Sequence, residues 1–388
     1  QFGASELESS QNDILNGTDD SLMKQNWLDA LADKPKQGAN VEDTIDPALQ
    51  QAAYDQLVGS GYEGSAVAIQ PSTGKILAMA SNPGYNPNDL MGDSAEETWA
   101  NLQEQEGQPL VNHAGAETLP PGSIFKIITT AAGLNNGFDP SSTLTGSNVI
   151  TLPDTVTELT NYANQKCNGQ DAVTLQTAFA LSCNTAFVEM SEQLGADELR
   201  KYAKAFGVGE NYDLGVSTSA GTLGDLPDGA ATAQSAIGQR DVTMTALQAA
   251  VMAGTVANKG TRMQPYLVNR ITDAQMKDVR TTKPKKADQA VNEETAATLT
   301  DLMYASERSS WGYDGNGFAS KTGTAEHGEG LAPHVWYVAF DPERDIAVGV
   351  VVKNGGNLGE SATGGKVSGP VGRAIPVSYT HLTLPTKR

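Results

Sequence analysis

The strongest chemical signal in the sequence is a serine followed three residues later by a lysine, Ser123-Ile124-Phe125-Lys126. The pair opens an apolar run with helical spacing, which places both side chains on one helix face, one turn apart. A serine hydroxyl becomes nucleophilic when a base takes its proton, and a lysine serves once burial or a nearby cation lowers its pKa. Alone the pattern is weak, because an N-cap serine and a surface lysine also produce it.

Two further motifs follow in the chain. Ser182-Cys183-Asn184 lies in a segment predicted to be helical from Thr174 to Leu194, and Lys321-Thr322-Gly323-Thr324 precedes a β-rich hairpin. Each is unremarkable alone. In this order, however, the three motifs form the signature of penicillin-binding proteins and class A β-lactamases. The trio therefore indicates acyl transfer through Ser123.

Beyond these motifs, the chain resembles class B penicillin-binding proteins, which are monofunctional D,D-transpeptidases, and among them the actinobacterial penicillin-binding protein A type. The resemblance covers residues 40–376. Besides the three motifs, it rests on Thr44-Ile45-Asp46-Pro47, Tyr85-Asn86-Pro87-Asn88 and Ile237-Gly238-Gln239. Ile124 departs from the family, which more often has a small hydroxylic residue there, but this is not a catalytic position.

The resemblance implies a role for each motif residue. Ser123 attacks a D-alanyl-D-alanine stem peptide, Lys126 is the general base, and Ser182 relays a proton to the leaving amine. The residues expected to bind the substrate are Asn184, Lys321, Thr322, Gly323 and Thr324. The backbone N–H groups of Ser123 and Thr324 would form the oxyanion hole. Penicillins would acylate the same serine and block it, and neither a cofactor nor a metal is expected.

Three other functions compete with cross-linking. A serine β-lactamase is disfavoured, because the span from Ser182 to Lys321 is longer than a compact hydrolase needs. A D,D-carboxypeptidase differs only in using water as acceptor, and the sequence separates it poorly. A non-catalytic penicillin-sensing or scaffold module would be favoured by substitution of a motif residue, and all are present.

Composition limits the partners. The chain has 388 residues and a formal charge of −20, from 46 acidic and 26 basic residues. Nucleic acid and anionic membrane surfaces are therefore disfavoured, since both attract concentrated positive charge. The expected partners are stem peptides and β-lactams. We expect the full-length protein to be membrane-anchored on the extracytoplasmic face, associated with cell-wall synthesis proteins. No stretch here reaches the ~18 apolar residues of a membrane span.

The order of predicted elements favours an α+β fold. Apolar runs at 66–69 and 76–80 predict one hairpin, and runs at 335–340 and 346–352 predict a second. Helices are expected at 48–57, 124–134, 174–194 and 246–257. These elements suggest an antiparallel sheet with edges from distant parts of the chain. The resemblance implies the penicillin-binding transpeptidase and serine β-lactamase-like fold, in which helices flank the sheet and an all-helical subdomain adjoins it.

Three segments are expected along the chain. Residues 1–39 are polar and read as the tail of a truncated upstream domain or as a linker, and the first residue is Gln rather than Met. Residues 40–376 form the transpeptidase domain. Residues 377–388, VSYTHLTLPTKR, resemble translated sequencing-adapter read-through, so we expect a non-native tail with no helical continuation.

The two cysteines, Cys167 and Cys183, have no metal-ligand spacing. A disulfide in an oxidising compartment and two free thiols remain equal alternatives.

Overall fold

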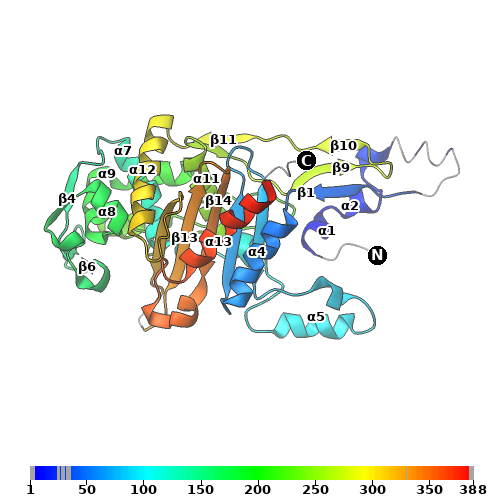
Figure 1. Ribbon diagram of the computed structural model, residues 1–388, viewed down its shortest axis with the longest axis horizontal. Coiled ribbons are helices and arrows are strands. Elements are labelled where there is room, and N and C mark those ends of the chain that lie inside the picture. The colour runs from blue at the N-terminus through cyan, green and yellow to red at the C-terminus, as the bar shows by residue number, and fades with distance from the viewer. Residues whose placement is uncertain (1–4, 24–26, 28–30, 32–35, 329, 384–388) are drawn as a thin grey trace.

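A five-stranded antiparallel sheet lies at the centre of the molecule (Figure 1). The computed structural model describes residues 5–23, 27, 31, 36–328 and 330–383. In spatial order the strands are β12 (Ala319–Ala325), β13 (His334–Asp341), β14 (Ile346–Val352), β2 (Gly64–Ile69) and β3 (Ile76–Asn82). The edge strands β12 and β3 are far apart in sequence, and the two predicted hairpins are β2–β3 and β13–β14. The predicted antiparallel sheet is confirmed.

Helices cover both faces of this sheet. The apolar helix α11 (Ala246–Ala257) packs on one face and starts with a capping box between Thr245 and Gln248. On the other face lie α4 (Pro47–Gly59), which has Asp46 as its N-cap, and α13 (Ser368–Thr383). Every residue of β14 is buried, as expected for a β-branched strand between two helical layers.

A helical subdomain adjoins the β12 edge, at the left of Figure 1. Its helices are α7 (Lys126–Leu134), α8 (Leu175–Leu181), α9 (Asn184–Ala205), α10 (Gly229–Ala236) and α12 (Glu293–Ser309). Two short ribbons accompany them: β4 (Thr143–Thr145) with β7 (Ala172–Thr174), and β5 (Val149–Thr151) with β6 (Glu158–Thr160). Among the helices that the structure describes, none is long and apolar enough to cross a membrane.

A smaller lobe lies at the other end of the molecule (Figure 1). It contains α1 (Glu6–Ser10), α2 (Asn12–Leu15) and a sheet of β1 (Asn40–Asp43), β9 (Val268–Thr272) and β10 (Asp278–Thr281). The described part of residues 1–39 is packed here, since Ile14, Leu22 and Ala39 are buried against Ile271. The remaining α-helices and strands of the described residues are α5 (Ala95–Glu104), α6 (His113–Ala116), and the ribbon of β8 (Thr261–Met263) and β11 (Lys286–Gln289).

Two predicted elements differ from the structure. The single helix expected from Thr174 to Leu194 is two helices, α8 and α9, separated at Ser182 and Cys183. The expected end of regular structure at residue 377 is also wrong, because α13 continues to Thr383. Tyr379 packs against the core between α13 and the sheet. Residues 384–388 lie outside the described residues.

Candidate active site

The nucleophile candidate lies at the junction between the sheet and the helical subdomain. Ser123 belongs to a short 3₁₀ turn, Gly122–Phe125, that continues directly into α7 at Lys126. Ser123 is partly exposed, whereas Lys126 is completely buried. A partly exposed serine one turn from a buried amine is an arrangement that suits a serine nucleophile with an adjacent base.

Two glycines let the backbone of this turn touch the backbone of β12. Gly122 has a φ of +54°, and a Cβ on it would lie 2.8 Å from the Thr324 carbonyl oxygen. A Cβ on Gly323 would lie 2.7 Å from the Pro121 carbonyl oxygen. The indole N–H of Trp336 also donates to the Pro120 carbonyl at 2.8 Å. The motifs at Ser123 and Lys321 are thus fixed to each other by main-chain contact.

Ser182 is the residue at which α8 ends and α9 is about to begin. Its backbone is left-handed, with φ 61° and ψ 40°. A non-glycine residue adopts this conformation at a cost, and such residues concentrate at functional sites. The turn exposes both the carbonyl and the hydroxyl of Ser182 to Lys126, which a continuous helix would not do.

The Lys126 amine is held by this turn. Its Nζ donates to the Ser182 carbonyl at 2.8 Å and to Asn184 Oδ1 at 2.8 Å, and it lies 3.3 Å from Ser182 Oγ. Burial, followed by the positive charge of Lys321, holds the pKa of Lys126 well below its usual value. A lowered pKa favours the neutral amine, which is the form that is able to accept a proton.

Lys321 reaches the same serine from the sheet. Its Nζ donates to Ser182 Oγ at 2.9 Å and to the Thr322 carbonyl at 3.1 Å. Complete burial lowers the pKa of Lys321 to about 7. In the described part of the chain, no carboxylate pairs with either lysine. The Ser182 hydroxyl therefore lies within hydrogen-bond distance of both lysine amines.

The remaining substrate-binding candidates line this junction. The Asn184 side chain donates from Nδ2 to the Thr160 carbonyl at 3.1 Å, so both ends of its amide are engaged. Thr322 and Thr324 are partly exposed on the edge strand. The Gly364 N–H donates to Thr324 Oγ1 at 3.3 Å. The hydroxyl proton of Thr324 is left available to another acceptor.

A disulfide braces the Ser182 turn. Cys167 and Cys183 are bonded, with Cα atoms 5.7 Å apart, and both are buried. Of the two alternatives left open by the sequence, the structure contains the bridge. It ties the loop that leads into β7 to the residue between Ser182 and Asn184.

Two other groups contribute to the site without any signal in the sequence. The Thr160 carbonyl orients Asn184, and Glu307 accepts from Ser320, the residue before Lys321. Neither belongs to a motif, and both reach the site only through the fold. Among the described residues, no group of three or more His, Cys, Asp or Glu side chains is arranged to hold a metal.

Known proteins are similar to this chain along most of its length. Residues 64–376 match the family of penicillin-binding protein transpeptidase domains, and residues 1–41 match the penicillin-binding protein A dimerisation domain. The peptidoglycan D,D-transpeptidase PbpA of Mycolicibacterium smegmatis is 42% identical over 390 residues, which cover 96% of this chain and 79% of that protein. The peptidoglycan D,D-transpeptidase PbpA of Mycobacterium tuberculosis is 40% identical over 390 residues, which cover 97% of this chain and 79% of that protein.

Solved structures show the same similarity. The ceftriaxone acyl-enzyme complex of penicillin-binding protein A from M. tuberculosis superimposes with a TM-score of 0.92 at 40% identity, over 96% of this chain and 87% of that one. The penicillin G acyl-enzyme complex of the same protein also superimposes with a TM-score of 0.92 at 40% identity, over 96% of this chain and 88% of that one.

Proposed function

Because this chain belongs to the penicillin-binding protein transpeptidase family, we propose that Ser123 is its nucleophile and Lys126 its general base. The protein is a peptidoglycan D,D-transpeptidase that β-lactams acylate. The observation that carries the assignment of roles is the buried Lys126 amine, which has a lowered pKa and no carboxylate partner in the described residues.

Acylation starts with proton transfer from the Ser123 hydroxyl to neutral Lys126. The alkoxide attacks the carbonyl between the two D-alanines of a stem peptide, and the N–H groups of Ser123 and Thr324 stabilise the oxyanion. Collapse of the tetrahedral intermediate breaks the peptide bond and leaves an ester on Ser123. The departing D-alanine amine takes a proton through the Ser182 hydroxyl, which contacts both lysines.

The second half-reaction returns the serine. An amine from a neighbouring stem peptide attacks the ester and forms the cross-link, and Ser123 regains its proton. A β-lactam supplies a strained amide that opens to the same kind of ester, which then blocks the site.

The substrate carboxylate is placed by β12. Lys321 provides a positive field when protonated, and Thr322 and Thr324 supply hydroxyls from partly exposed positions on the edge strand. Gly323 keeps the strand close to the Ser123 turn. Asn184 contacts the substrate amide backbone. These assignments agree with the charge of a stem peptide that ends in a carboxylate.

Peptidoglycan lies outside the cytoplasmic membrane, and the protein acts there. We further propose that the full-length protein is anchored to the extracytoplasmic face of the membrane and works with other cell-wall synthesis proteins. The disulfide supports this location, because such bonds persist in oxidising compartments.

Labelling with a fluorescent penicillin tests the nucleophile. Penicillin should acylate the wild-type protein at Ser123, as identified by mass mapping of the modified peptide, and Ser123→Ala should abolish labelling. Ser94→Ala, at a serine with no side-chain capping bond, is the control and should label normally. Persistent labelling of a folded Ser123→Ala protein would refute the assignment.

A further inference from the structure

A second buried polar cluster lies behind the strand that carries Lys321. Its centre is Glu307 in α12, which is completely buried. One carboxylate oxygen accepts from Arg373 Nε at 2.6 Å and from Asn316 Nδ2 at 3.0 Å. The other accepts from the Tyr337 hydroxyl at 2.9 Å and from the Ser320 hydroxyl. Four donors thus satisfy one buried carboxylate.

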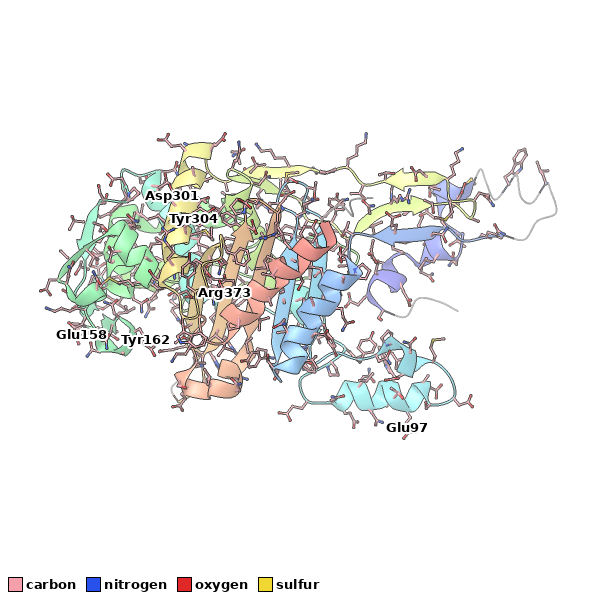
Figure 2. All side chains as sticks on the ribbon, in the orientation of Figure 1. Glu97, Glu158, Tyr162, Asp301, Tyr304 and Arg373 are labelled. Atoms are coloured by element: carbon pink, nitrogen blue, oxygen red, sulfur yellow. A yellow bond between two sulfur atoms is a disulfide. The ribbon has the colours of Figure 1, made fainter. Side chains whose placement is uncertain are left out.

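The four donors come from different parts of the chain around β12. Ser320 is in β12 itself, and Tyr337 is the β13 residue paired with Thr322. Asn316 precedes β12, and Arg373 extends from α13 beside the sheet (Figure 2). Glu307 therefore joins the edge strand to its neighbour and to two helices.

An ion pair between Arg373 and Glu307 is part of this cluster. The Arg373 guanidinium also donates to the Trp311 carbonyl at 3.1 Å and lies 5.4 Å from the centre of the Tyr337 ring. A buried ion pair is tolerated only when geometry and additional hydrogen bonds compensate for lost solvation. Displacing any one donor leaves the buried carboxylate with fewer hydrogen bonds, which opposes a shift of the strand.

Because side chains alternate between the two faces of β12, a restraint on Ser320 also affects the position of Lys321. Successive side chains point to opposite faces of a sheet. Ser320 points to Glu307 on one face, and Lys321 therefore points to Ser182 Oγ on the other. A rotation or slip of β12 that broke the first contact would break the second.

From this arrangement we infer that Glu307 is a positioning residue for Lys321 and Thr322 in the transpeptidase reaction. Glu307 touches neither the nucleophile nor the base; it acts through Ser320 and Tyr337. The inference rests on the proposed function, in which Lys321 and Thr322 recognise the substrate carboxylate. It assigns the α12–α13 ion pair a part in catalysis as well as in stability.

The test uses two thioester acyl donors, one with a free carboxylate on its leaving group and one with that carboxylate amidated. Wild-type protein should acylate faster with the free acid. Glu307→Gln should lower the rate with the free acid by about tenfold or more and should reduce the ratio between the two donors. Loosening of the whole site would instead lower both rates equally and leave the ratio unchanged.

Glu210→Gln is the matched control, because Glu210 also pairs with a buried arginine, Arg262, at 2.6 Å, outside this cluster. It should lower the melting temperature but keep both acylation rates within twofold of wild type. If Glu307→Gln does not fold, Tyr337→Phe and Ser320→Ala each remove a single donor and should reduce the same ratio.

An unchanged ratio in folded variants would overturn the inference. Failure of the proposed function would look different, since the wild-type protein itself would not be acylated at Ser123.

Discussion

The two faces of β12 differ in whether their buried charged groups are paired. We call the face that carries Lys321 the inner face and the face toward Glu307 the outer face. On the inner face, Lys126 and Lys321 are completely buried, and no described carboxylate pairs with them. On the outer face, Arg373 and Glu307 are buried as an ion pair at 2.6 Å. Burial without a counterion lowers the pKa of an amine and favours its neutral form. A buried ion pair instead depends on the geometry and hydrogen bonds of the groups around it. One strand thus separates two buried amines without a carboxylate partner from a buried ion pair.

The largest expected effect is on the inner face. Lys126→Arg replaces an amine that loses its proton with a guanidinium that stays charged. We expect the penicillin acylation rate to fall by roughly a hundredfold or more, the usual cost of removing a general base. Stopped-flow acylation measures this change, and Lys126→Met, which carries no base, should be equally slow. A near-normal rate in Lys126→Arg would exclude Lys126 as the base.

Substitutions on the outer face are expected to lower the free energy of unfolding. Arg373→Met leaves the Glu307 carboxylate buried without its cation, and we expect the free energy of unfolding to fall by about 3–5 kcal/mol. Lys321→Met removes a buried amine with no ionic partner and should cost less. Urea unfolding of the two variants at neutral pH measures the difference. Equal losses would contradict the distinction between the two faces.

The Cys167–Cys183 disulfide restrains the Ser182 turn on the inner face, whereas an ion pair stabilises the outer face. Titration of denatured, unreduced protein should find no free thiol, because Cys167 and Cys183 are bridged. Replacing both with serine opens a loop with a sequence separation of 16 residues. This should lower the free energy of unfolding by about 3 kcal/mol on the chain-entropy estimate.

The double variant should also acylate more slowly than wild type, because the Ser182 turn is no longer braced. Two titratable thiols in the wild-type protein would rule out the bridge.

The smallest expected effect is the change in stability for each single pH unit. Because burial lowers the pKa of Lys321 from 10.5 to about 7, the folded protein binds fewer protons than the unfolded chain between these values. Lys321 therefore destabilises the folded protein at the lower end of that interval. This penalty decreases as the pH rises, by at most about 1.4 kcal/mol per pH unit. Lys321→Met should show a shallower slope between pH 7 and 9, and identical slopes would argue against a lowered pKa.

The inner face was largely predictable, because its residues occur in short motifs. Ser123 and Lys126 are one turn apart, and their order with the other two motifs identified the chemistry. The left-handed backbone of Ser182 could not be predicted, since the apolar spacing from Thr174 to Leu194 continues through it. Serine is also not a residue type that indicates this conformation.

The outer face could not be predicted at all. Glu307 and Arg373 are 66 residues apart, and each reads as an ordinary charged residue on a helix. Only the packing of α12 and α13 around the edge of the sheet brings them together. Tyr337 and Ser320 lie in apolar strands, where the sequence pattern indicates core and gives no hint of a shared carboxylate.

The main-chain contact between the Ser123 turn and β12 limits how this enzyme is able to vary. Every amino acid other than glycine carries a Cβ, and at Gly122 and Gly323 that atom would lie 2.8 Å and 2.7 Å from a backbone carbonyl oxygen. Inherited substitutions at these two positions are therefore expected to inactivate the enzyme. Variants that escape β-lactams while still building cell wall should arise instead among side chains that border the site, where a new residue has room.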